Sequence, residues 1–126
     1  MPANLPLSCA PGWCSTMPPP LTAKDVCANL RRMARPDKGY TLGAPGVWHQ
    51  FLGDAIIEAT DTRTLTIALS RPIADLLDIL AQGFIVAPSC LPQLDTGQLD
   101  ALVGSGPYRA LLRKWRRGIH LANPAW

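Results

Sequence analysis

Prolines and glycines are the feature of this sequence that most limits its fold. The 126 residues include thirteen prolines and ten glycines, which gather in residues 1–20 and again between Pro36 and Gly46. Proline removes a backbone donor and glycine widens backbone freedom, so both interrupt regular elements. The regular structure must consist of short elements elsewhere, and we expect these two stretches to be loops or disordered ends.

The first regular segment is predicted to be a helix. Thr22 is a suitable N-cap, and Asp25 three residues later brings the pattern close to a capping box. Apolar side chains then recur at helical spacing. These are Val26, Leu30 and Met33. We expect a helix from about Ala23 to Ala34, ended by Pro36.

A β-hairpin is the clearest pattern that follows. Residues 55–60 and 64–69 are strand-like, and Asp61-Thr62-Arg63 between them has turn chemistry. In the second run, Leu65, Ile67 and Leu69 alternate with smaller residues, which is typical of a half-buried strand. In the irregular segment before the hairpin, the apolar residues either anchor a loop or short helical turn on the core or line a ligand pocket. These are Trp48, Phe51 and Leu52.

The second half is predicted to add one helix and three short strands. Pro72 suits the first turn of a helix that Ser70 could cap and that ends near Gly83. Its apolar stripe would contain Ile73, Leu76, Leu77 and Leu80, with Asp75 and Asp78 off it. We expect a buried strand at residues 84–87, a polar loop with Asp95, Gly97 and Asp100, and strands from Tyr108 and at residues 119–121. The fold class is therefore α+β.

The charge distribution leaves two interpretations open. The net charge of +3 is too small to indicate a nucleic-acid partner by itself. Five cations nevertheless gather near the C-terminus, namely Arg109, Arg113, Lys114, Arg116 and Arg117. They are either the solvated face of a strand pair or, in an alternative function, part of a small basic nucleic-acid- or partner-binding module in which Trp115 stacks on a base.

Several other function classes find no support in the sequence. No run approaches the roughly 18 apolar residues of a membrane-spanning helix. The first residues lack a signal-peptide pattern, so we expect the chain to be cytoplasmic if made as written.

The cysteines (Cys9, Cys14, Cys27 and Cys90) form no Cys-x-x-Cys pair, and neither His49 nor His120 stands at zinc-finger spacing from them, so we expect no metal. Ser105 lies between glycines but lacks the Gly-x-Ser-x-Gly elbow, and no carboxylate pair stands out, so we expect no enzyme.

Six motifs follow one another from Pro20 to Trp126. They are Pro20-Leu21-Thr22-Ala23-Lys24-Asp25-Val26, the hairpin ending at Leu69-Ser70-Arg71-Pro72, an apolar helix, a short strand ending at Pro88, Gly104-Ser105-Gly106-Pro107-Tyr108, and a strand pair closing on Asn123-Pro124-Ala125-Trp126. In this order they resemble the middle of family 5 extracellular solute-binding proteins, the peptide- or nickel-type receptors of ABC transporters. In that family the turn reads Gly-Thr-Gly-Pro-Tyr and the end reads Asn-Pro-x-Tyr-Trp.

The resemblance implies that residues 21–126 are part of a type II periplasmic-binding-protein-like fold, from a receptor several times longer. The parent would be a periplasmic or extracellular receptor, without enzymatic activity or cofactor, that passes a peptide or similar small solute to an ABC permease. It would bind no nucleic acid and would not insert into the membrane. The motif residues would define the fold rather than contact ligand, and they are Thr22, Asp25, Gly104, Gly106, Pro107, Tyr108, Asn123, Pro124 and Trp126. Because the family binds ligand between two lobes, we expect this chain to have little or no ligand affinity.

Residues 1–20 depart from the family, which has a strand of the type Leu-Arg-Pro-Gly-Val-x-Phe-His-Asp-Gly there. With codons that the genetic code allows, residues 8–17 read two bases out of frame give Leu-Arg-Pro-Gly-Val-Val-Phe-His-Asp. The frame would be regained within Pro18-Pro19-Pro20, whose codons are rich in cytosine. Our hypothesis is that this segment is either disordered or a frame-shifted form of the family strand.

Sequencing the source DNA from well upstream of Met1 to well past Trp126 tests the frame-shift hypothesis. We expect the shifted frame to continue upstream into a signal peptide and the downstream DNA to continue the receptor. An intact frame with ordinary start and stop codons, and no receptor sequence on either side, would contradict it.

Overall fold

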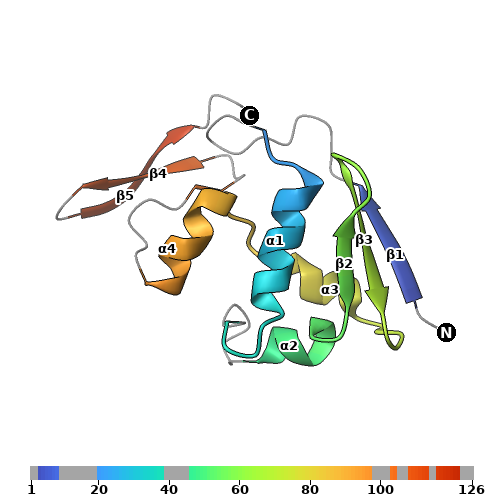
Figure 1. Cartoon of the computed structure of the whole chain (residues 1–126). Helices are drawn as coiled ribbons and strands as arrows, with labels where there is room; N and C mark the ends of the chain where they lie inside the picture. Colours follow the sequence, from blue (N-terminus) through green and yellow to red (C-terminus); the bar gives the residue numbers. More distant parts are fainter. Residues whose placement is uncertain are drawn as a thin grey trace. The chain divides into compact units, whose positions relative to one another are not determined.

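The computed structural model describes residues 3–8, 20–38, 46–97, 103–104, 108–113 and 116–122. The chain divides into two compact units. The first consists of Met1–Ala10 and Thr22–Phe84, and the second of Pro11–Leu21 and Ile85–Trp126. Short helices and small antiparallel sheets make up both units (Figure 1), which confirms the predicted α+β class.

A three-stranded antiparallel sheet is the base of the first unit. It contains β1 (Ala3–Ser8), β2 (Ile56–Ala59) and β3 (Thr64–Leu69) in the order β1-β3-β2 (Figure 1). β2 and β3 are the predicted hairpin. No strand was predicted within residues 1–20, because the prolines and glycines there favoured a loop or a disordered end. Pro6 is nevertheless accommodated in β1, on the edge of the sheet.

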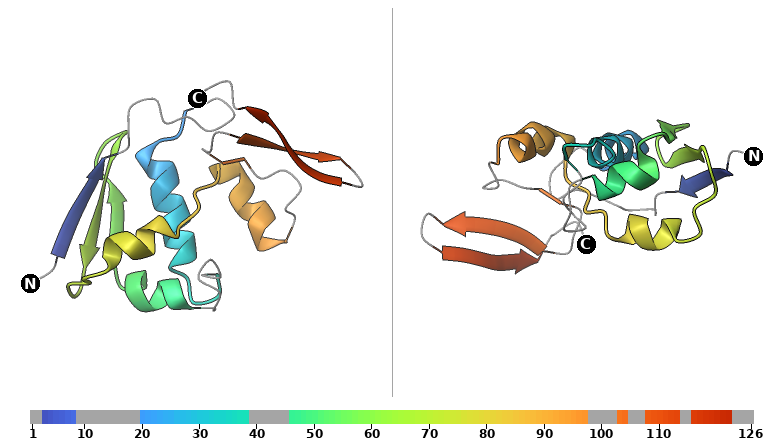
Figure 2. Two further views of the ribbon diagram at one scale, coloured as in Figure 1. Left: turned by 180° about the vertical axis from the view of Figure 1, so that it is seen from behind. Right: turned by 90° about the horizontal axis from the view of Figure 1, so that it is seen from below.

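The core of this unit lies between the sheet and helix α1 (Ala23–Met33). Leu65, Ile67 and Leu69 on alternate positions of β3 are buried, as the period-2 pattern predicted. The apolar stripe of α1 is buried as well, and Figures 1 and 2 show this helix running beside β2. Matching an apolar strand face to an apolar helix stripe removes both from water.

Helix α2 (Val47–Leu52) adds two side chains to this core. Trp48 and Leu52 are buried and Phe51 is half-buried, so these residues anchor a short helix, as one of the two interpretations held. The Nδ1 atom of His49 lies 2.8 Å from the carbonyl oxygen of Ala34 and joins α2 to the end of α1. A Trp48 side chain with no exposed surface belongs to the core, not to a ligand-accessible lining.

The predicted helix from Pro72 is shorter than expected. Helix α3 spans Leu76–Ala81 with Asp75 at the N-cap, so Pro72 and Ile73 precede it and Ser70 does not cap it. Leu76 is buried but Leu77 is 63% exposed, which corrects the predicted stripe. Adjacent residues of a helix point about 100° apart, and a helix of six residues presents only one narrow buried face.

The second unit also differs from the prediction before its hairpin. Residues 84–87 form no strand: Phe84 is 78% exposed, and only Val86 makes an isolated bridge, to Gly104. The expected polar loop instead contains a 3₁₀ turn, η2 (Pro88–Cys90), and helix α4 (Leu91–Asp95). Prolines lie in the first turn of both elements, where a missing N–H costs no helical hydrogen bond.

The predicted C-terminal strand pair is present. β4 (Tyr108–Arg113) and β5 (Arg116–Ala122) pair antiparallel, with a register shift between Arg109 and Ala110. β5 begins three residues earlier than the predicted strand at residues 119–121. Lys114 and Trp115 lie outside the described residues, so the alternative role given to Trp115 stays a prediction.

Replacing Ile67 by valine tests the position of the core. Ile67 has no exposed surface, so loss of one methyl group should lower the free energy of unfolding by about 1 kcal/mol in a urea titration. Ile56→Val is the matched control, because Ile56 is 62% exposed on the neighbouring strand, and its effect should stay within about 0.5 kcal/mol. Equal effects of the two substitutions would contradict the assignment of the core face.

Candidate functional site

Thr22 and Asp25 are residues of the predicted fold-defining set whose side chains are described. The backbone N–H of Thr22 donates to the Asp25 carboxylate at 2.8 Å, and the Thr22 hydroxyl donates to the same oxygen at 2.9 Å. This confirms the predicted capping box at the start of α1. Both groups of this motif are used in starting a helix, which is a structural role.

Two further contacts fix this helix start. The N–H of Ala23 donates to the Thr62 carbonyl of the β2–β3 turn at 2.8 Å. The side-chain amide of Asn29, a buried polar residue, donates to the Asp25 carbonyl at 2.8 Å. Sequence reasoning missed Asn29, whose only signal is a polar residue at position i+4 from the capping acid.

The β2–β3 turn is organised by one carboxylate. Oδ1 of Asp61 accepts hydrogen bonds from the backbone N–H groups of Arg63 at 2.7 Å and Thr64 at 2.9 Å. The Arg63 hydrogen bond, followed by that from Thr64, lowers the pKa of Asp61 below its ordinary value of 3.8. Asp61 is exposed, yet its lone pairs are committed to the turn, which indicates a role in the hairpin.

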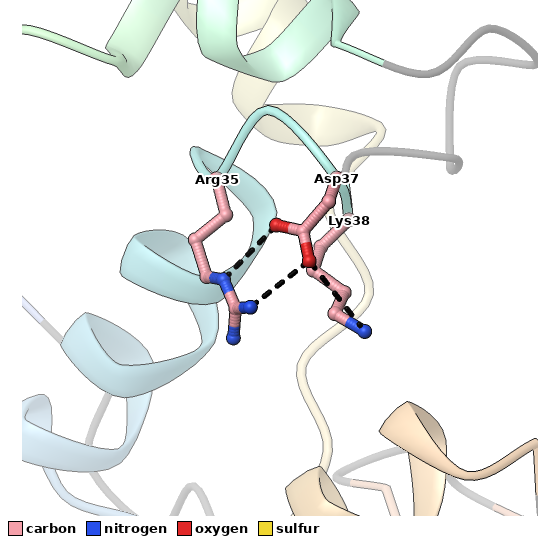
Figure 3. Close-up of polar contacts among 3 residues, drawn as sticks. All are labelled: Arg35, Asp37 and Lys38. Carbon is pink, nitrogen blue, oxygen red and sulfur yellow. Dashed lines mark hydrogen bonds and ion pairs between the residues drawn. The ribbon is translucent and has the colours of Figure 1, made fainter.

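A charged cluster follows helix α1 (Figure 3). Nε and one terminal nitrogen of Arg35 bind the two carboxylate oxygens of Asp37 at 3.1 and 2.9 Å, and the Lys38 ammonium lies 3.8 Å from Asp37. The side chains of Arg35 and Asp37 are 51% and 55% exposed. Such surface pairs contribute little to stability. Two of the five N–H groups of the Arg35 guanidinium donate to Asp37, and this carboxylate offsets one positive charge of the cluster.

The Gly-Ser-Gly-Pro-Tyr motif is described only at its ends. Gly104 bridges to Val86, and the neighbouring Val103 carbonyl accepts the N–H of Ala87 at 2.8 Å. Tyr108 begins β4 opposite Ala122. The other motif residues, Gly106, Pro107, Asn123, Pro124 and Trp126, lie outside the described residues. Their structural role, and that of the motif as a unit, remains a prediction.

The described ranges contain neither a metal-binding cluster nor a membrane-spanning helix. There, no group of three or more His, Cys, Asp or Glu side chains is placed to hold a metal ion. The helices of the described segments are too short or too polar to cross a membrane.

The family of the chain is shown by a match to a protein-family model. Residues 19–121 match the model of bacterial extracellular solute-binding proteins, family 5, middle region. The chain belongs to this family. A comparison of this solute-binding protein chain with curated proteins gives no match.

Solved structures of binding proteins share the fold. The chain is similar to MoaA from A. tumefaciens R10 in complex with mannopinic acid, at 21% identity and a TM-score of 0.77, over 97% of this chain and 24% of that one. A substrate-binding protein from Microbacterium hydrocarbonoxydans, complexed with 4-hydroxybenzoate hydrazide, gives 25% identity and a TM-score of 0.73 over 98% and 26%. AgaA from A. tumefaciens R10 with agropinic acid gives 23% and 0.66 over 93% and 25%.

Two facts follow for this family 5 chain. It spans about a quarter of the length of these similar structures. The family and the similar structures are binding proteins rather than enzymes, which agrees with the sequence analysis.

The pH dependence of stability tests the role of Asp61. A pKa lowered by folding means that the ionised carboxylate stabilises the native state above pH 3.8, and that this contribution is lost as the pH falls below that value. Asp61→Asn should therefore lower the thermal midpoint at neutral pH, and the difference from the wild type should shrink in acid. Thr62→Ala, in the same turn, should leave the slope with pH unchanged. A constant difference between Asp61→Asn and the wild type at all pH values would contradict this role.

Proposed function

We propose that this chain is part of the solute receptor of an ABC importer. The family match over residues 19–121 carries the proposal, and it is supported by the similarity of 97% of the chain to a solute-bound binding protein, with a TM-score of 0.77. The receptor would act outside the cytoplasmic membrane and deliver its solute to an ABC permease. Chemistry is not required of it, since affinity and release are its whole task.

The solute class is proposed from the similar structures. Those proteins are in complex with two acids and a hydrazide, all small organic molecules. We therefore propose that the parent receptor binds a small organic solute. Peptides are one candidate, because the family resemblance implies them. Receptors of this type act by closing two lobes around the ligand, and the hinge motion needs both lobes.

The proposed role of the described residues is support. The polar groups of Thr22 and Asp25 form hydrogen bonds at the start of α1, and the Asp61 carboxylate accepts hydrogen bonds within a turn. The buried apolar residues of the first unit are packed in its own core, whereas Ile56, Leu77 and Phe84 are exposed. Groups committed in this way hold the scaffold in place and leave ligand contacts to other segments, so the chain by itself should have little or no ligand affinity.

Thermal unfolding with added solutes tests this proposal. We expect no shift of the midpoint of this chain with mannopinic acid, agropinic acid, 4-hydroxybenzoate hydrazide or a tripeptide. A protein translated from the frame-corrected DNA with its flanking sequence should be stabilised by one of these or a related solute, because a ligand that binds only the native state raises its stability.

The competing function has its own assay. Fluorescence anisotropy of labelled single-stranded DNA should show no binding by this chain at physiological salt. Tight binding with a steep decrease in affinity as salt increases would contradict the receptor proposal and favour the basic nucleic-acid-binding module.

A further inference from the structure

Strand β2 forms one edge of the three-stranded sheet, and its pairing shows which groups it directs outward. The N–H of Thr60 donates to the Thr64 carbonyl at 3.0 Å, so these two residues are a hydrogen-bonded pair. Hydrogen-bonded and non-hydrogen-bonded pairs alternate in antiparallel sheets. Ile57 and Ala59, one step out of phase with Thr60, therefore turn their N–H and C=O groups away from β3.

One of these outward groups is already occupied. The guanidinium of Arg31, on helix α1, donates a hydrogen bond to the carbonyl oxygen of Ile57. A strand that added to β2 would need that oxygen as an acceptor. Arg31 also brings a positive charge to the edge, and cationic side chains are one means by which proteins keep sheet edges from pairing.

The opposite edge of the sheet is closed in a different way. Because β3 uses Thr64, Thr66 and Ala68 toward β2, it turns Leu65, Ile67 and Leu69 toward β1. The intervening residues of β1 face outward, and Pro6, opposite Thr66, is one of them. Proline has no N–H to offer a further strand, and an outward position on an edge strand is where a sheet tolerates it.

We propose that Arg31 protects the β2 edge of the described sheet and, together with Pro6 on the β1 edge, prevents strand addition from a second copy of the chain. The guarded segment needs protection, since β2 and β3 combine β-branched and apolar residues over short runs with few charges. Arg31 does not belong to the motif residues of the family resemblance, and its role is independent of any ligand.

The variant Arg31→Gln tests this proposal in the full chain. Gln keeps the helix propensity of Arg but is shorter and uncharged. We expect thioflavin T fluorescence to increase severalfold faster than in the wild type, with oligomers detected by sedimentation velocity. Arg35→Gln is the matched control, because it makes the same charge change on the exposed Arg35–Asp37 pair and should aggregate at the wild-type rate.

A rescue variant separates edge protection from general destabilisation. Ala59→Pro added to Arg31→Gln removes an outward N–H of β2, as Pro6 does on β1, and should return aggregation to the wild-type rate. Equal acceleration by Arg31→Gln and Arg35→Gln, or failure of Ala59→Pro to slow aggregation, would overturn the proposal. If circular dichroism shows Arg31→Gln to be unfolded, Arg31→Met takes its place, because Met is also uncharged and a good helix former, with the same expected acceleration and the same rescue.

Discussion

Burial of one face of β3 is the interaction on which the first unit depends. Ile67, at the centre of this strand, pairs with Leu5 of β1 on one side and Ile57 of β2 on the other, and it has no exposed surface. Among the described strands β3 is the central one, so β1 and β2 both take their register from it. Because strand side chains alternate with a period of exactly two residues, a slip of one residue would turn the apolar set of β3 toward solvent.

The position of α1 is fixed by contacts between its first residues and the β2–β3 hairpin. Ala23 donates to the carbonyl of Thr62 in the turn that Asp61 holds, so the N-terminus of α1 is tied to the β2–β3 hairpin. The capping box of Thr22 and Asp25 then sets the helix direction. These polar groups form hydrogen bonds that join α1 to the β2–β3 hairpin and are not available to bind a ligand. This is consistent with a supporting role for the region.

The sequence predicted elements whose signal is local and missed those that depend on partners. Helix α1, the β2–β3 hairpin and the final strand pair carry their own caps, turns and periodicity, and all three are present. Strand β1 was missed because its signal is the partner β3, which lies about sixty residues away along the chain. Leu77 was misplaced because an apolar residue in a helical pattern says nothing of how wide the buried face is. Helix α4 was missed because the segment with Asp95, Gly97 and Asp100 was interpreted as a polar loop, whereas Pro92 lies in the first turn of a short helix.

The two units differ in charge, and this difference bears on function. The first unit contains seven Lys or Arg residues against seven Asp or Glu, whereas the second contains five against two, so the whole net charge of +3 belongs to the second unit. The described hairpin of that unit, β4–β5, has two strands and places Arg113 opposite Arg116. A two-stranded ribbon is marginal alone. Such a ribbon is stable when other segments of a protein cover it and supply negative charge. A receptor about four times longer can provide those segments. A small basic module on its own would have that negative charge only when it is bound to a nucleic acid.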